Sequence, residues 1–294
     1  MDRDACLLVN PSAGGGKAAR VLPQVEAELA RLGIASRTAT TRSLEHAVEL
    51  AREGAASGEA VVTLSGDGLI GAVVGALREV PGALLGVLPG GRGNDLARVL
   101  GIPPEPVPAC AVLVDGEVRD LDIGEVDGHS FIGIASLGFD SVANELANAA
   151  PSWLGAQAYT YGALRALLGW KPATFTVEAG DGIRTVRGWS VAAANSKAYG
   201  GGMFVAPDAE LDDGLLDLVL SSESSKLKFL RVLPKVFKGE HIHESNVSVF
   251  RAESVRITAD RPFTVYADGD PIGELPVTIR AVPRALKVLC PRSS

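Results

Sequence analysis

The chain has 294 residues, 47% of them hydrophobic and 21% charged, and its formal net charge is −7. This length exceeds that of a usual single domain, so two domains are expected. The acidic balance excludes a general nucleic-acid binder, because such a protein needs a broad basic surface, and we expect no nucleic-acid partner.

The cysteines and histidines do not suggest a metal or disulfide framework. Cys6, Cys110 and Cys290 lie far apart and form no CxxC pair, which fits a reducing cytosol. His241 and His243 are close together, but two histidines without further ligands are more typical of a polar surface than of a metal site. No run approaches the ~20 apolar residues of a membrane span, so we expect a cytoplasmic protein.

The first 123 residues alternate apolar runs, glycine-rich loops and helical patterns. Ala5–Val9 predicts a buried strand, and apolar residues at three- and four-residue spacing from 18 to 32 predict a helix after it. The runs 60–64 and 84–88 predict two more strands, each followed by a glycine-rich loop. Repeated units of this kind predict an α/β domain with a parallel sheet over residues 1–123.

From about residue 124 the pattern changes to short, often alternating runs separated by turn residues. These predict a mainly antiparallel β domain over residues 124–282. The expected strands are 131–136, 174–178, 185–193, 215–220, 247–250, 254–258, 263–266 and 277–282. Two helical insertions are expected within this domain, near residues 153–168 and 225–237.

The glycine-rich loops carry the chemistry of the first domain. Ligands bind at the carboxyl ends of the strands in such sheets, and backbone N–H groups reach phosphates only where side chains are absent. The loop 14–17 is not a Walker A sequence, and no GxGxxG motif with a following acidic residue is present, which disfavours a nicotinamide-dependent dehydrogenase. Asp67 follows a strand between two glycines. We predict that it helps to hold Mg²⁺ at the phosphates or to activate the attacking hydroxyl; an Asx-turn is the alternative.

Taken together, three loops resemble the nucleotide loops of the diacylglycerol kinase catalytic-domain family. The loops are Asn10-Pro11-Ser12-Ala13-Gly14, Ser65-Gly66-Asp67-Gly68-Leu69 and Pro89-Gly90-Gly91-Arg92-Gly93-Asn94-Asp95-Leu96-Ala97-Arg98. The family includes bacterial diacylglycerol kinases, a phosphatidylglycerol kinase branch, and the sphingosine and ceramide kinases. The nucleotide-binding residues that the resemblance implies are Asn10, Pro11, Ser12, Ala13, Gly14, Thr41, Gly66, Asp67, Gly68, Leu69, Gly91, Arg92, Gly93, Asn94 and Asp95.

The same resemblance implies the architecture and the cofactors. An N-terminal α/β domain similar to that of NAD kinases is expected to bind ATP with Mg²⁺. A C-terminal antiparallel β-sandwich is expected to cover the lipid, and residues 283–294 to return to the first domain. Residues 207–217 resemble a segment that binds Mg²⁺, with the Asp213 carboxylate and the main-chain oxygens of Glu210 and Leu215 as ligands. A solvated hairpin loop is the alternative for this turn.

The proton acceptor is predicted from a third match. Asp268-Gly269-Asp270 stands where relatives carry Asp-Gly-Glu, and in the bacterial enzymes that glutamate is the proposed base. Asp270 is therefore predicted to take the proton of the lipid hydroxyl. An ordinary Asp-Gly turn is the alternative, and Glu274 is a second candidate base.

Three positions depart from the family pattern. Leu69 replaces the usual Thr, as it does in the sphingosine kinase branch, and Gly71-Ala72 replaces the usual Asn-Glu pair. Arg92 stands in place of the usual Thr of the third loop and brings several donors for phosphate oxygens. These changes keep open a non-catalytic lipid- or nucleotide-binding regulator as an alternative function.

A basic segment near residue 230 suits contact with a membrane surface. Between residues 226 and 238 there is no acidic residue, and apolar residues alternate with Lys226, Lys228, Arg231, Lys235 and Lys238. Such a segment is typical of peripheral contact with an anionic bilayer, here its inner face. A helix docked on the β domain with a solvated basic face is the alternative, and Pro234 makes one uninterrupted helix doubtful.

The function expected from this evidence is an ATP- and Mg²⁺-dependent lipid kinase that acts on diacylglycerol. A sphingosine or ceramide kinase is the second enzyme hypothesis. An NAD kinase fits the basic segment and the Asp268-Gly269-Asp270 turn less well. A homodimer is expected by resemblance only.

Overall fold

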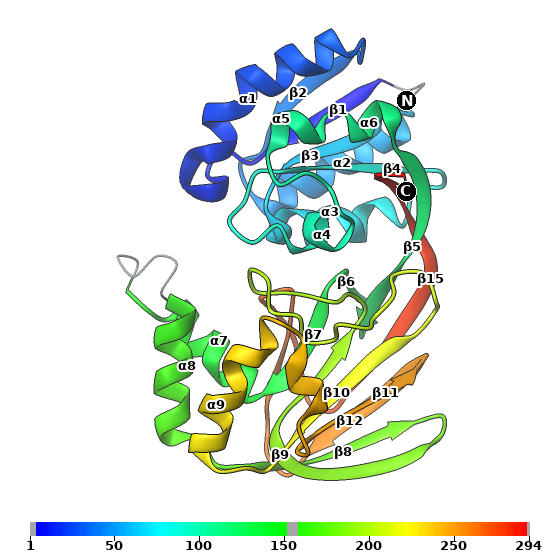
Figure 1. The fold of residues 1–294 in the computed structure, drawn as a ribbon. Helices are drawn as coiled ribbons and strands as arrows, with labels where there is room; N and C mark the ends of the chain where they lie inside the picture. The colour runs from blue at the N-terminus through cyan, green and yellow to red at the C-terminus, as the bar shows by residue number, and fades with distance from the viewer. Residues whose placement is uncertain (1–3, 152–157, 293–294) are drawn as a thin grey trace.

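Two long strands run between the two halves of the molecule in Figure 1. The structure, a computed structural model, describes residues 4–151 and 158–292. The two strands are β5 (Glu117–Val126) and β15 (Val277–Cys290), and they pair antiparallel along most of their length. The boundary expected at 123/124 therefore falls inside β5.

The N-terminal half is a parallel sheet with helical connections. Its strands are β1 (Ala5–Val9), β2 (Ser36–Thr40), β3 (Ala60–Ser65) and β4 (Leu84–Pro89), in the order β4-β3-β1-β2. Its helices are α1 (Ala13–Arg31), α2 (Leu44–Ala56), α3 (Asp67–Leu77), α4 (Asp95–Val99), α5 (Pro106–Ala109) and α6 (Val112–Asp115). β1, β3 and β4 are buried throughout, which is why they read as unbroken apolar runs.

The C-terminal half is mainly antiparallel. Its strands are β6 (His129–Phe131), β7 (Ile134–Gly138), β8 (Ala173–Ala179), β9 (Gly182–Ala194), β10 (Leu216–Ser222), β11 (Val247–Ala252), β12 (Ser254–Ala259), β13 (Thr264–Ala267) and β14 (Asp270–Glu274). Its helices are α7 (Phe139–Asn148), α8 (Ala158–Gly169), α9 (Lys226–Val236) and the 3₁₀ helix η2 (Glu240–His243). The predicted fold class, an α/β domain followed by a β-sandwich-like domain, is confirmed.

Several predicted elements differ from the observed ones. The single strand expected at 131–136 is two short strands, and the one expected at 277–282 continues to Cys290. The helix expected near 153–168 is observed as α8, and residues 152–157 lie outside the described chain. α9 runs on through Pro234 as one helix, contrary to the doubt raised by the proline.

Helix α7 was not predicted. It begins where Gly138, at φ 95°, turns the chain out of β7. The hydroxyl of Ser141 accepts the Gly138 N–H at 3.0 Å and donates to the Gly138 carbonyl at 2.8 Å, which fixes the first turn. A strand that leads directly into a helix through one glycine leaves no loop composition for the sequence to reveal.

The last strand joins both halves. Lys287 and Val288 of β15 pair in parallel with Leu84 and Leu85 of β4, while the start of β15 pairs antiparallel with β12. β15 therefore continues the parallel sheet of the first half, as Figure 1 shows at its right side. Within residues 4–151 and 158–292, no helix is long and apolar enough to cross a membrane.

Candidate active site

Three glycine-rich loops meet at the carboxyl ends of β1, β3 and β4. Residues 10–14 connect β1 to α1, residues 66–69 begin α3, and residues 91–95 lead into α4. Gly14 has φ 60°, and a Cβ on it would lie 2.6 Å from the Gly90 carbonyl oxygen. A Cβ on Gly66 would lie 3.1 Å from the Cα of Gly91. The loops thus approach backbone to backbone, and their N–H groups are what this edge offers to an anion.

Two asparagines in these loops hold the backbone itself. Oδ1 of Asn10 accepts the N–H of Ser12 at 3.0 Å. Oδ1 of Asn94 accepts the N–H of Gly91 at 2.8 Å, and its Nδ2 donates to the Gly91 carbonyl at 3.2 Å. Asn94 itself has a positive φ of 52°, which asparagine tolerates better than most residues. Both side chains therefore shape the loops before any ligand is present.

Three further residues predicted to bind nucleotide lie in different settings. Thr41 is buried at the end of β2, and its hydroxyl donates to the Val9 carbonyl at 3.2 Å. Leu69 is only 3% exposed and packs in the core of the first half. Arg92 is exposed, and its Nη2 lies 3.6 Å from the place that a Cβ on Gly15 would take. Of these three, Arg92 alone presents a charged group to the loops.

Three aspartates line a cavity of about 410 Å³ between the two halves. Asp67 lies at the start of α3, Asp95 at the start of α4, and Asp268 in the turn between β13 and β14. The cavity lining comprises Asp67, Ile70, Arg92, Gly93, Asp95, Leu96, Ile132, Gly133, Asn144, Ser196, Ala198, Tyr199, Gly200, Gly201, Asp268 and Gly269. One wall is therefore formed by α3 and by the third glycine-rich loop with α4, and the other wall belongs to the β half.

The three carboxylates differ in how well they are satisfied. Asp268 accepts three main-chain N–H groups, from Ile132 and Gly133 at 2.9 and 3.1 Å and from Ile134 at 3.0 Å. Asp95 accepts the N–H of Gly201 at 2.7 Å and is ion-paired with Arg98. Asp67 has one long bond, at 3.3 Å, from the N–H of Leu96, and a further main-chain interaction at Asp95.

Burial raises the pKa of the Asp67 carboxyl, and the negative charge of Asp95 raises it further. The charge of Asp268 adds a smaller contribution in the same direction. Burial also raises the pKa of Asp268, against the three N–H groups that favour its ionised form. A carboxylate with a raised pKa and few donors is a stronger proton acceptor than an ordinary one, and Asp67 meets that description best.

Asp270 and Glu274, the two bases predicted from sequence, lie outside the lining of this cavity. Asp270 is exposed and lines a neighbouring cavity of about 300 Å³, beside Gly71 and Ala72, and partial burial raises the pKa of its carboxyl. Asp268 lines both cavities. Asp268 belongs to the same Asp-Gly-Asp turn and had no predicted role, yet it lines the cavity that contains Asp67, whereas Asp270 does not.

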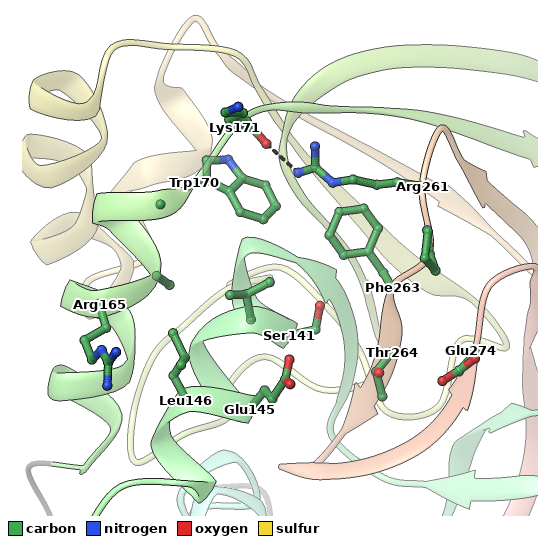
Figure 2. A pocket seen from close by; sticks show the side chains of 14 residues that line it. Ser141, Glu145, Leu146, Arg165, Trp170, Lys171, Arg261, Phe263, Thr264 and Glu274 are labelled. Atoms are coloured by element: carbon green, nitrogen blue, oxygen red, sulfur yellow. Dashed lines mark hydrogen bonds between the residues drawn. The ribbon is translucent and has the colours of Figure 1, made fainter.

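Glu274 lines a third cavity, of about 500 Å³, shown in Figure 2. Its walls are α7, α8 and the β13–β14 hairpin, and it contains the rings of Trp170 and Phe263. The guanidinium of Arg261 lies 5.2 and 5.0 Å from these two ring centroids and donates to the Lys171 carbonyl. This aromatic, partly basic cavity is separate from the Asp67 cavity in its described lining.

Two polar groups on the β side of the Asp67 cavity were missed by sequence reasoning. Asn144 of α7 is 8% exposed and Ser196 is 2% exposed. Nδ2 of Asn144 and Oγ of Ser196 have no hydrogen-bond partner among the described residues. A buried polar group without a partner is costly, so these two atoms mark the wall where a polar ligand would be bound. No sequence motif identifies Asn144 or Ser196, because their positions in the cavity wall depend on how α7 and the end of β9 pack in the folded protein.

Comparison with known proteins decides the family. Residues 4–126 match the diacylglycerol kinase catalytic domain, and residues 133–290 match the YegS C-terminal NAD kinase beta sandwich-like domain. The diacylglycerol kinase of Mycobacterium tuberculosis is 34% identical over 295 residues, covering 97% of this chain and 94% of that protein. The chain belongs to the diacylglycerol kinase family of lipid kinases. This membership implies that it uses ATP.

Other members of the diacylglycerol kinase family agree over the full chain. The Bacillus subtilis diacylglycerol kinase is 28% identical, with 98% of this chain and 96% of that protein covered. A probable YegS-like lipid kinase of Chromohalobacter salexigens is 30% identical, with 100% and 95% covered. The crystal structure of a putative diacylglycerol kinase from Bacillus anthracis has a TM-score of 0.82 at 20% identity, covers 98% of this chain and 97% of that chain, and shares the fold.

The Mg²⁺ segment that the diacylglycerol kinase resemblance implies is held by an arginine in this structure. Oδ1 of Asp213 accepts the Leu215 N–H at 2.9 Å, and its Oδ2 lies 3.5 Å from Nη1 of Arg251. The same guanidinium lies 3.3 Å from Asp217 and donates to the Asp208 carbonyl at 2.8 Å. The described residues hold no group of three Asp, Glu, His or Cys side chains suited to a metal. The predicted oxygen ligands suit Mg²⁺ in kind, but Arg251 already supplies the positive charge, so the metal stays a prediction.

Proposed function

We propose that this lipid kinase transfers the γ-phosphoryl group of ATP to the free hydroxyl of diacylglycerol, which gives phosphatidic acid. The observation that carries the proposal is the cavity between the halves. One wall carries Asp67 and the third glycine-rich loop, whose main-chain N–H groups suit phosphates, and the other wall holds the unpartnered groups of Asn144 and Ser196. The names of the full-length relatives favour diacylglycerol as the acceptor.

The glycine-rich loops would bind the phosphates of ATP through main-chain N–H groups. Arg92, exposed beside Gly15, would add charge-assisted hydrogen bonds to phosphate oxygens. The Mg²⁺ that ATP carries would offset the phosphate charge, and Asp95 would be the carboxylate beside it if Asp67 serves as the proton acceptor. Asn144 and Ser196 would bind the oxygens of the acceptor lipid near its free hydroxyl.

In the transfer step, the hydroxyl oxygen of the lipid forms a bond to the γ-phosphorus while the bond from that phosphorus to the β–γ bridging oxygen breaks. ADP leaves, and the hydroxyl proton goes to a carboxylate. Asp67 is the acceptor we favour, because it lines the cavity, accepts only main-chain N–H groups, of which the bond from Leu96 is long at 3.3 Å, and has a raised pKa. Asp270 is the second candidate, carried by the family resemblance and by its exposed carboxylate.

One structural observation bears on each of the two alternative functions. A sphingosine or ceramide kinase was favoured by Leu69, but the 3% exposure of that side chain leaves it no contact with which to select a lipid. A non-catalytic regulator is favoured by Gly71 and Ala72, which leave the cavity beside Asp270 without the usual polar pair. The retained Asp67 favours catalysis over this second alternative.

The proposal is tested by transfer of labelled phosphate from γ-labelled ATP to micellar diacylglycerol, phosphatidylglycerol, sphingosine and ceramide. Asp67→Asn, Asp268→Asn and Asp270→Asn are compared with the wild type. We expect label in phosphatidic acid, and a fall of about 10²-fold or more in Asp67→Asn. A comparable loss in Asp270→Asn with near-normal Asp67→Asn would move the base to Asp270. Label in another lipid alone, or ATP binding with no labelled product, would reject the proposal.

A further inference from the structure

Helices α8 and α9 present an outward surface that is both apolar and basic. Four large apolar side chains on these helices are strongly exposed: Leu164 (54%), Leu168 (82%), Leu227 (70%) and Leu230 (42%). A fifth, Phe237, follows the last turn of α9 and is 53% exposed. Isolated exposed apolar residues need no explanation, but four on two adjacent helices, with Phe237 just beyond the second, form an apolar patch whose exposure to water is unfavourable.

The two helices are joined at this surface. Nζ of Lys226, at the start of α9, donates to the main-chain oxygen of Leu168 near the end of α8, at 2.9 Å. Leu168 and Leu227 therefore lie next to the same bridge, and Figures 1 and 2 both place α9 alongside α8. The exposed residues of α9 recur at three- and four-residue spacing, so they form one face of the helix.

The opposite face of α9 is packed. Phe229 stacks on Trp189 with ring centroids 4.1 Å apart, and Val232 is 9% exposed. Phe229, Val232, Leu233 and Val236 also line a small, mostly apolar cavity in the β half. Because the inner face of α9 already packs against the β half, the outer leucines are not needed to hold the helix in place.

The basic residues of this segment divide into two groups. Lys235 and Lys228 face Glu244, at 2.7 and 3.9 Å, so their charge is used within the protein. Lys226, Arg231 and Lys238 form no salt bridge with any residue in the described ranges. They lie on or beside the exposed face, and no acidic residue occurs from 226 to 238. Arg165 adds a further exposed cation on α8, next to Leu164.

We propose that the α8–α9 surface, made of these five apolar side chains with Lys226, Arg231, Lys238 and Arg165, docks on an anionic lipid bilayer. The chain as a whole carries −7 and would be repelled by such a surface, so attraction requires a local cationic face. Leucine and phenylalanine side chains entering the headgroup region add the apolar contribution that cations alone lack. This inference rests on the proposed function in one respect: a kinase for a water-insoluble acceptor must meet that acceptor at a membrane.

The test is sedimentation of the full chain with vesicles of phosphatidylglycerol and phosphatidylcholine. Leu227→Glu/Leu230→Glu is compared with Ile183→Glu, a control in which an equally exposed (71%) apolar side chain outside α8 and α9 is changed. We expect the double variant to lose at least about tenfold in vesicle affinity, and the control to bind like the wild type. Arg231→Ala and Lys238→Ala should each lose about fivefold, and added salt should weaken binding of the wild type.

Equal binding by the wild type and the double variant, or an equal loss in the Ile183 control, would overturn the docking surface. Thermal unfolding of each variant checks that the fold is kept, which is expected because all the changed side chains are exposed. Phosphorylation of a short-chain, water-soluble diacylglycerol separates this inference from the proposed function. If vesicles bind through the leucines but no diacylglycerol is phosphorylated, the docking surface stands and the proposed acceptor is wrong.

Discussion

The main-chain N–H of Gly201 donates to Oδ2 of Asp95 over 2.7 Å, and this bond crosses the cavity from the β half to the third glycine-rich loop. The other oxygen of the carboxylate pairs with Arg98, which also donates to the Gly93 carbonyl at 3.1 Å. Gly201 has φ 85°, a conformation that positions its N–H toward the loop with no side chain in the way. Asp95 therefore ties the loop beside Asp67 to the opposite wall.

We expect Asp95→Ala to lower kcat/KM by about 10²-fold, because the loop beside Asp67 loses its fixed distance from the β half. Unfolding should become easier by about 1–3 kcal/mol, since Arg98 and the Gly201 N–H both lose a partner. Steady-state kinetics and chemical unfolding measure the two effects. Asp181→Ala, which removes a surface ion pair with Arg184, is the control and should change neither. Unchanged kcat/KM in Asp95→Ala would show that the loop is held without this bond.

The pH dependence of the reaction should reflect the ionisation of the Asp67 carboxyl. Its pKa is raised by burial first and by Asp95 second, so the carboxylate needed as a base forms only at a higher pH than an ordinary aspartate requires. kcat/KM should therefore rise with pH through this raised pKa and then level off. Asp95→Asn removes the second cause, and its acid limb should move to lower pH. An acid limb that stays in place in Asp95→Asn, or one shared by Asp67→Asn and the wild type, would assign the titration to another group.

The stability of the acidic turn near Asp213 should depend on Arg251. Asp217 is 3% exposed, and in Arg251→Ala it loses its guanidinium while remaining buried. We expect a loss of about 2–3 kcal/mol of stability, measured by thermal or urea unfolding. Mg²⁺ should stabilise Arg251→Ala more than the wild type, because the oxygens freed from the arginine become available to a cation. Equal effects of Mg²⁺ and EDTA on both proteins would mean that arginine and metal do not share these oxygens.

Asp140 should make the protein more stable in mild acid. Burial raises its pKa to about 6 from 3.8, despite a hydrogen bond with Ser190, so the folded protein retains this proton when the unfolded chain has lost it. Stability should fall as pH rises from about 4 to about 6 and stay low above that range. Asp140→Asn should remove this dependence and raise stability at neutral pH by up to ~3 kcal/mol. Urea unfolding across this pH range measures it, and a wild-type profile that is flat there would contradict the raised pKa.

The loops could be predicted because each follows a buried strand in the sequence. An apolar run that ends in Asn10-Pro11, or in Gly66-Asp67, marks both the strand and the edge where it stops. The convergence of Gly14, Gly66 and Gly91 then follows from the parallel order of the strands. These features are local, so a single stretch of sequence carries each one.

The opposite wall of the cavity could not be predicted in the same way. Asp268 reaches the N–H groups of residues 132–134 across more than 130 positions. Whether Asp268 or Asp270 lines this cavity depends on which carboxylate of the turn faces inward. Asn144 lies on a helix that the sequence did not indicate, and Ser196 gains its place from the end of β9. The identity of these residues was visible, but their shared cavity arises from tertiary packing alone.

The pairing of β15 with β4 has a consequence for how the chain is made. Until the ribosome has added residues 287 and 288, β4 has no partner on its outer side, although the other parallel strands were synthesised some 200 residues earlier. The nascent N-terminal half therefore exposes an open sheet edge until β15 is made, the kind of edge that favours pairing with other chains. Completion of the N-terminal sheet therefore waits for β15, and it takes place only together with closure of the β half.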